Sequence, residues 1–114
     1  MRVVTPAFLG RFPGRVINLH PALLPSFPGA SPIEDAMQYG VRVTGVTVHF
    51  VDEGVDTGPV ILQQAVDINY NDSIEKLRER IHKVEHMLLP QAISLIAAGR
   101  VRLEGENSRR VVIE

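Results

Sequence analysis

Three stretches of the chain carry the hydrophobic pattern of β-strands. Residues 15–20, in which Val16, Ile17 and Leu19 are apolar, are predicted to form a strand covered on both faces in a parallel sheet. Residues 41–51 are rich in Val, Thr and Phe without a helical period, and residues 60–68 read as a further strand after a loop at 52–59. Because that loop is too short for a crossover helix, the last two strands are predicted to pair antiparallel.

A short helix is predicted after the first strand. Ser31 fits the N-cap position, Pro32 fits the first helical position, and Glu34 completes a capping box with Ser31. Gly40 suits the position just beyond a helix, where a left-handed backbone ends it. The sequence therefore predicts a helix from Pro32 to just before Gly40.

A longer helix is predicted to follow an N-cap at residues 71–73. One apolar face recurs at steps of three and four residues, through Ile74, Leu77, Ile81, Val84, Leu88, Ala92 and Leu95. Pro90 lies inside this pattern and is predicted to kink the helix or to split it near residues 86–89. Beyond Gly99, residues 101–103 and 109–113 are predicted to form a small hairpin, and residues 1–5 read as the end of a strand.

Polar side chains gather where the first predicted strand opens into a loop. Residues 18–29 read N-L-H-P-A-L-L-P-S-F-P-G, and the period of two places Asn18 and His20 on one face of the strand. An imidazole and an amide can stabilise an oxyanion, and a carboxylate such as Asp56 can accept the proton of an attacking amine. These three residues suggest acyl-type transfer. On residue chemistry alone a structural interpretation is favoured, with Asn18 capping the loop and Asp56 in an Asx turn.

Composition narrows the function classes. The 114 residues suffice for one domain (1–114), and a net charge of −1 argues against a nucleic-acid platform. The absence of Cys excludes disulfides and thiolate sites and suits a cytoplasmic location. No apolar run approaches the roughly 20 residues of a membrane span. His82 and His86 have ligand spacing but no third partner, so no metal is expected, and His49 reads as a structural, hydrogen-bonded histidine.

Two long motifs resemble one enzyme family. N-L-H-P-A-L-L-P-S-F-P-G, followed by V-T-G-V-T-V-H-F-V-D-E-G-V-D-T-G-P-V-I-L-Q-Q, is similar to the formyltransferases that use 10-formyltetrahydrofolate. The resemblance covers the chain from Met1 to about Arg102. It implies the C-terminal part of a doubly wound, Rossmann-like α/β fold, with a mainly parallel sheet and an antiparallel edge hairpin. It also implies formyl transfer from 10-formyltetrahydrofolate to the amine of glycinamide ribonucleotide, in purine biosynthesis de novo.

The resemblance assigns roles to individual residues. Asn18, His20 and Asp56 would be catalytic: Asn18 and His20 would stabilise the oxyanion, and Asp56 would keep His20 charged and help to move the amine proton. Glu85 would bind the glycinamide end of the substrate. The folate pocket would be formed by Met1, Arg2, Val3, Val4, Leu9, Val16, Val51, Asp52, Glu53 and Val55.

The chain departs from the family pattern because the N-terminal half, with its glycine-rich phosphate loop, is absent. We therefore expect negligible activity from this polypeptide alone, since remote binding energy holds a substrate in the attacking geometry. Exposed apolar faces and a sheet edge predict a homo-oligomer, or complementation with an N-terminal half. Two alternatives stay open, namely a formyltetrahydrofolate hydrolase and a non-catalytic module that binds folate or serves in assembly.

Overall fold

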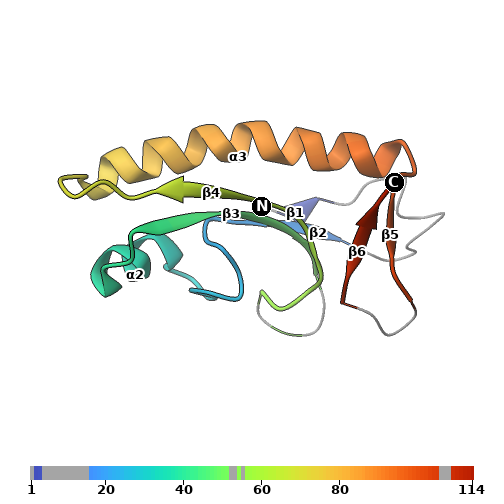
Figure 1. Cartoon of the computed structure of the whole chain (residues 1–114), viewed down its shortest axis with the longest axis horizontal. Helices are drawn as coiled ribbons and strands as arrows, with labels where there is room; N and C mark the ends of the chain where they lie inside the picture. The colour runs from blue at the N-terminus through green and yellow to red at the C-terminus, as the bar shows by residue number, and fades with distance from the viewer. Residues whose placement is uncertain (1, 4–15, 52–53, 55, 106–108) are drawn as a thin grey trace.

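A four-stranded sheet forms the centre of the fold (Figure 1). The structure, a computed structural model, describes residues 2–3, 16–51, 54, 56–105 and 109–114. The strands lie in the order β1-β2-β3-β4, and each is antiparallel to its neighbour. Their bounds are Arg2–Val3 (β1), Ile17–His20 (β2), Val43–Phe50 (β3) and Val60–Asp67 (β4).

The direction of the strands corrects one prediction. An α/β fold with an antiparallel β3–β4 hairpin is confirmed, but the mainly parallel, doubly wound sheet is not observed among the described residues. A run of apolar residues indicates that a strand is buried on both faces. It does not indicate whether the neighbouring strands run parallel or antiparallel to it. Strand β3 makes the point, because it is buried from Thr44 to Phe50 although both of its partners run antiparallel to it.

Helix α2 (Pro32–Tyr39) has the predicted ends but not the predicted cap. Gly40 adopts a left-handed backbone (φ 90°), and its N–H donates to the carbonyl of Ala36 at 3.1 Å. The capping box is wrong, because the Ser31 side chain makes no capping hydrogen bond. Glu34 instead pairs with Arg78 at 3.0 Å, which joins α2 to the second helix. A guanidinium is a stronger partner for a carboxylate than one backbone N–H.

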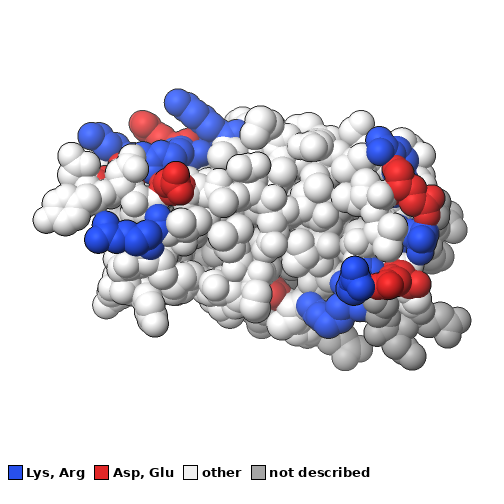
Figure 2. Space-filling model, in the orientation of Figure 1, with Lys and Arg blue, Asp and Glu red and all other residues white. Residues whose placement is uncertain are grey.

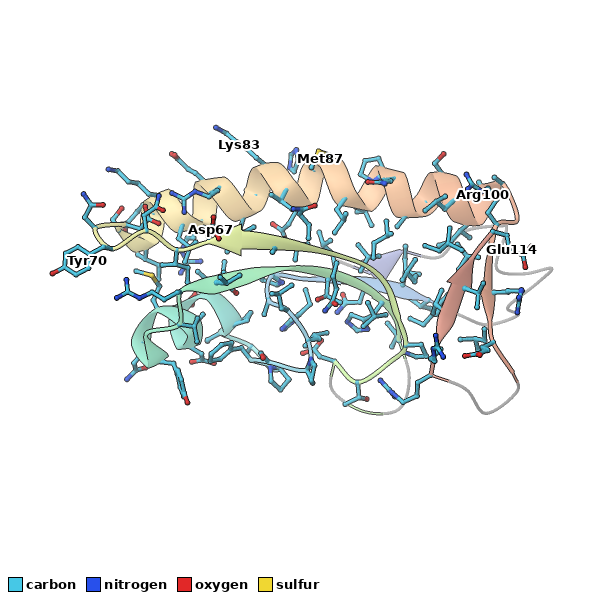
Figure 3. All side chains as sticks on the ribbon, viewed as in Figure 1. Asp67, Tyr70, Lys83, Met87, Arg100 and Glu114 are labelled. Atoms are coloured by element: carbon cyan, nitrogen blue, oxygen red, sulfur yellow. The ribbon has the colours of Figure 1, made fainter. Side chains whose placement is uncertain are left out.

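Helix α3 (Ile74–Ala97) runs along one face of the sheet as a single helix (Figure 1). The predicted split near residues 86–89 is wrong, whereas a kink at Pro90 stays a prediction. Pro90 is exposed, so its ring and the carbonyl it leaves unbonded lie on the side where water is available. In Figure 3 the side chains of Lys83 and Met87 likewise point away from the sheet.

One apolar cluster joins both helices to strands β2, β3, β4 and β5. Its largest fully buried members include Phe50 and Ile17 from the sheet and Leu77 and Ile81 from α3. The helix face that packs on the sheet is the one that the three- and four-residue spacing predicted. None of the helices formed by the described residues is long and apolar enough to cross a membrane.

A separate two-stranded sheet follows α3, as the sequence predicted. Strands β5 (Val101–Leu103) and β6 (Val111–Ile113) pair antiparallel, and the backbone N–H of Glu114 donates to the carbonyl of Arg100 at 2.8 Å. Figure 3 shows both residues where α3 meets the hairpin. On the face shown in Figure 2, side chains of both charge signs gather at the two ends of the molecule, and the middle shows only one small acidic patch.

An ion pair fixes the turn between β4 and α3. Arg80 donates to both carboxylate oxygens of Asp72, at 2.8 and 3.0 Å, and to the carbonyl of Asp67 at 2.8 Å. These hydrogen bonds from Arg80, with one from the backbone N–H of Asn69, lower the pKa of Asp72 to about 2. The contribution of Asp72 to stability is therefore complete above about pH 3.8 and is lost as the pH falls through about 2.

This ion pair gives a pH-dependent prediction. The free energy of unfolding of the wild-type chain should fall between pH 4 and pH 2 more steeply than that of Asp72→Asn, because the variant has no proton to bind at this site. Urea unfolding at a series of pH values measures the difference. Glu79→Gln, which removes an exposed carboxylate of the same helix, serves as the control. If the free energy of unfolding of wild type and of Asp72→Asn fell with the same slope between pH 4 and pH 2, the prediction would be contradicted.

Candidate active site

Strand β2 presents two polar side chains on one face of the sheet. Asn18 lies opposite His49 and His20 lies opposite Thr47 in the pairing with β3, so all four belong to the same face. The alternation in the sequence predicted this arrangement. Leu19, between them, belongs to the opposite face and joins the apolar cluster under α3. The strand therefore holds an amide and an imidazole side by side on a rigid element.

His20 is enclosed and has an acceptor near each ring nitrogen. Its Nε2 lies 2.8 Å from the carbonyl oxygen of Phe27, and its Nδ1 lies 3.5 Å from Oδ1 of Asp56. A carbonyl only accepts hydrogen bonds, so Nε2 carries a proton. The ring is thus bound to the loop through Nε2 and faces the Asp56 carboxylate through Nδ1.

Asp56 is the point at which the site converges. Its Oδ1 lies 3.4 Å from the amide nitrogen of Asn18, as well as 3.5 Å from the His20 ring. Its Oδ2 accepts a hydrogen bond from the backbone N–H of Gly29 at 2.9 Å. The side chain is only 12% exposed. The structure therefore brings together Asn18, His20 and Asp56, three residues that the sequence singled out.

His49 lies beneath this trio and orients Asn18. Its Nδ1 donates to the carbonyl of Phe50 at 2.8 Å, so Nε2 is free to accept from the Asn18 amide at 3.4 Å. His49 is hydrogen-bonded as expected, and its Nε2 also lies 3.7 Å from Oδ1 of Asp56, so a purely structural role stays a prediction. Both contacts of the Asn18 amide are long, at 3.4 Å, which leaves this group more loosely held than the His20 ring.

The backbone around the site is strained at two residues. Phe27 (φ 53°) and Asp56 (φ 54°) are the non-glycine residues with a left-handed backbone in the described part of the chain. Phe27 supplies the carbonyl that binds His20, and its ring meets that of Tyr39 edge-on, with centroids 5.9 Å apart. Such strain persists where surrounding contacts over-determine the conformation, and it tends to cluster at functional sites.

A hollow of about 470 Å³ opens beside Asp56. Arg109, from the start of the segment that leads into β6, lies at its edge and donates to the carbonyl of Thr57. The other lining residues are Leu24, Pro25, Pro28, Gly58 and Val60. Of the trio, Asp56 borders this largely apolar space.

The predicted folate pocket is only partly described. Strand β1 pairs with β2 so that Arg2 is opposite Asn18, and the N–H of Val51 donates to the carbonyl of Val16 at 2.7 Å. The backbones of Arg2, Val3, Val16 and Val51 thus gather at the end of the sheet next to Asn18. Six predicted pocket residues lie outside the described residues, namely Met1, Val4, Leu9, Asp52, Glu53 and Val55.

Glu85 lies in a different hollow from the trio. Its Oε1 is 3.4 Å from Nδ1 of His82, and it lines a space of about 350 Å³ with Leu19, whose side chain is on the α3 side of the sheet. The other lining residues are His86, Leu89 and Pro90. Its role as a substrate ligand stays a prediction. Among the described residues, no group of three or more His, Cys, Asp or Glu side chains could hold a metal ion.

Sequence reasoning missed the backbone contacts that orient the trio. The carbonyl of Phe27 and the N–H of Gly29 bind His20 and Asp56, but a backbone group leaves no signature in a sequence. It also missed Gln63, whose side chain binds the loop that carries those groups. The available sequence signal was the position of Gln63 in a predicted strand, whereas its pairing with Thr47 is known only from the structure.

Comparison with known proteins gives a consistent result. A sequence model of the formyl transferase family matches residues 1–93. Phosphoribosylglycinamide formyltransferase of Mycobacterium tuberculosis is 48% identical over 116 residues, covering 99% of this chain and 54% of the relative. The trifunctional purine biosynthetic protein adenosine-3 of Chironomus tentans is 48% identical over 103 residues, covering 90% of this chain and 8% of that protein.

A solved structure agrees with these sequence matches. Glycinamide ribonucleotide transformylase 1 from Symbiobacterium toebii superposes with a TM-score of 0.83 at 50% sequence identity, covering 99% of this chain and 52% of that one. The chain thus spans about half the length of the Mycobacterium and Symbiobacterium proteins, and a small part of the trifunctional one.

Proposed function

The chain belongs to the formyl transferase family, and we propose that it carries the catalytic part of a phosphoribosylglycinamide formyltransferase. In this proposal it transfers the formyl group of 10-formyltetrahydrofolate to the amine of glycinamide ribonucleotide, a cytoplasmic step of purine biosynthesis. The observation that carries the proposal is the convergence of the Asn18 amide and the His20 ring on Oδ1 of Asp56, at 3.4 and 3.5 Å.

The proposed chemistry is direct attack by the amine on the formyl carbon. A bond forms between that carbon and the amine nitrogen, and the formyl oxygen becomes an oxyanion. Asp56 accepts the proton that the amine nitrogen loses, directly or through a water. When the intermediate collapses, the bond between the formyl carbon and the folate nitrogen breaks, and the leaving nitrogen takes a proton from the site.

The hydrogen bonds in the site suggest how His20 and Asn18 divide the work. The Nε2–H of His20 is bound to the Phe27 carbonyl at 2.8 Å, so His20 acts on the oxyanion mainly through its positive charge. Asn18 makes two long contacts of 3.4 Å and can turn its amide towards the oxyanion at little cost. Asn18 is therefore the proposed hydrogen-bond donor.

The assignments of ligands rest on the family likeness. The backbone of β1 beside Asn18, together with Val16 and Val51, is consistent with a formyl donor bound at that end of the sheet. Glu85 remains the proposed ligand of the glycinamide end. Since the chain spans about half the length of its relatives, we propose that turnover requires the part of the enzyme that it does not span. Self-association of this chain is the alternative.

The function is tested by complementation. The purified chain is mixed with the separately expressed part of the Mycobacterium tuberculosis relative that it does not span, and loss of the formyl donor is followed by absorbance. We expect turnover that requires both polypeptides and glycinamide ribonucleotide. Turnover at the same rate without glycinamide ribonucleotide would indicate the formyltetrahydrofolate hydrolase. Folate binding without turnover, from two folded and associated polypeptides, would favour the non-catalytic module and overturn the proposal.

A further inference from the structure

A buried hydroxyl lies at the start of the loop that orients the trio. Thr47, on β3, donates to the carbonyl of Ala22 at 2.6 Å and accepts from the N–H of Leu24 at 3.2 Å. It also accepts from Nε2 of Gln63 at 3.0 Å. A hydroxyl has one proton and two lone pairs, so all of its hydrogen-bonding capacity is used. Thr47 is fully buried, and its orientation is therefore fixed.

Gln63, on β4, completes the attachment of the loop to the sheet. Its amide donates to the carbonyl of Leu24 at 2.9 Å as well as to Thr47. The N–H and the carbonyl of Leu24 are thereby both held, one by Thr47 and the other by Gln63. Gln63 and Thr47 are direct partners in the register of β3 and β4. The loop is thus hydrogen-bonded to two neighbouring strands, through Thr47 of β3 and Gln63 of β4.

The held segment leads directly into the two backbone groups that orient the trio. Three residues after Leu24, the carbonyl of Phe27 accepts a hydrogen bond from His20. Phe27 has a left-handed backbone, which persists only where surrounding contacts hold it in place. Two residues further, the N–H of Gly29 donates to Asp56. A shift at Leu24 would therefore alter the contacts of both His20 and Asp56.

We propose that Gln63 is a positioning residue for the formyl-transfer site, acting on His20 and Asp56 through the loop of residues 22–29. The proposal rests on the function proposed above, in that it takes these two residues as the groups that act on the formyl carbon. In the hydrogen bonds of the site, Gln63 itself contacts neither His20 nor Asp56. A purely structural glutamine would lower the stability of the chain without changing the environment of the His20 ring.

The neighbouring glutamine provides a matched control. Gln64 has the same side chain on the same strand, but it donates to the carbonyl of Ala65 at 3.2 Å and alternates to the other face. Gln63→Leu and Gln64→Leu therefore remove the same chemical group from adjacent positions. Only the first removes a hydrogen bond to the loop.

The test uses nitrogen-15 NMR on the chain alone, so that it does not depend on turnover. In Gln63→Leu we expect a changed chemical shift at Nε2 of His20 and about five- to tenfold faster exchange of the Gly29 amide, as the loss of one hydrogen bond gives. Gln64→Leu should match wild type in both. In the complementation assay Gln63→Leu should lower kcat with little change in KM.

The outcomes separate this proposal from the proposed function. An unchanged His20 ring and Gly29 amide in a folded Gln63→Leu chain would overturn the positioning role. If Gln63→Leu does not fold, Gln63→Glu is measured instead, because its carboxylate cannot donate to the Leu24 carbonyl, and the same two readouts decide. If the NMR changes occur while the wild-type mixture never turns over, the positioning role stands and the proposed function fails.

Discussion

His20→Ala is expected to lower the rate of formyl transfer by about 10²- to 10⁴-fold, the usual loss when a positioned acid–base group is removed. The Nδ1 of the His20 ring lies 3.5 Å from Oδ1 of Asp56, and in the proposed mechanism the charge of the ring stabilises the developing oxyanion. Most of the loss should appear in kcat, because the ring is 5% exposed and offers little surface for ground-state binding. Steady-state kinetics of the complemented enzyme measures the effect.

Asp56→Asn tests whether the trio acts as a unit. It should lower turnover to a similar degree, and the double variant should be little slower than the slower single variant, because each change disables the same pair. Gln38→Ala, an exposed change on α2, is the control for handling and concentration. A folded His20→Ala variant that keeps turnover within about tenfold of wild type would contradict the assignment of His20.

Gly45→Ala is expected to destabilise the fold by about 3 kcal/mol or more, at the upper end of what overpacking costs. A Cβ built at Gly45 would lie 2.3 Å from the backbone oxygen of Gln64 and 2.5 Å from Cδ2 of Leu23. A side chain can turn away, but the oxygen belongs to the neighbouring strand, which pairs with β3 along its whole length. The sheet must therefore separate locally. Urea unfolding measures the loss.

Gly105→Ala provides the comparison for this change. Nothing lies within 4 Å of a Cβ at Gly105, so its unfolding free energy should stay within about 0.5 kcal/mol of wild type. Because Leu23 belongs to the loop that holds His20 and Asp56, Gly45→Ala should also reduce turnover at temperatures where the chain remains folded. Equal stability of the two alanine variants would contradict the close approach at Gly45.

Local elements could be predicted from the sequence because their causes are local. Gly40 ended α2 as predicted, since few other residues accept its left-handed backbone. The short loop before Val60 fixed the antiparallel hairpin. The apolar spacing located α3, and its continuity through Pro90 followed from an exposure that no sequence pattern reports.

Long-range relations could only be predicted in part. The period of two placed Asn18 and His20 on one face, but the residues alone gave no reason for Asp56, 38 positions beyond Asn18, to join them. That link came from the resemblance of two motifs to a known family. Strand direction and the pairing of Glu34 with Arg78 depend on how separate elements pack, and the sequence does not encode them in any local pattern.

The left-handed backbone at Phe27 lowers the stability of the fold but places the carbonyl that binds His20. An aspartate tolerates that conformation, but an aromatic side chain does so rarely, so the cost falls on Phe27 rather than on Asp56. Glycine at position 27 would relax the chain, yet it would remove the ring that rests on Tyr39 and loosen the carbonyl acceptor of His20. Selection for turnover would therefore keep phenylalanine at this position despite the cost of its backbone conformation.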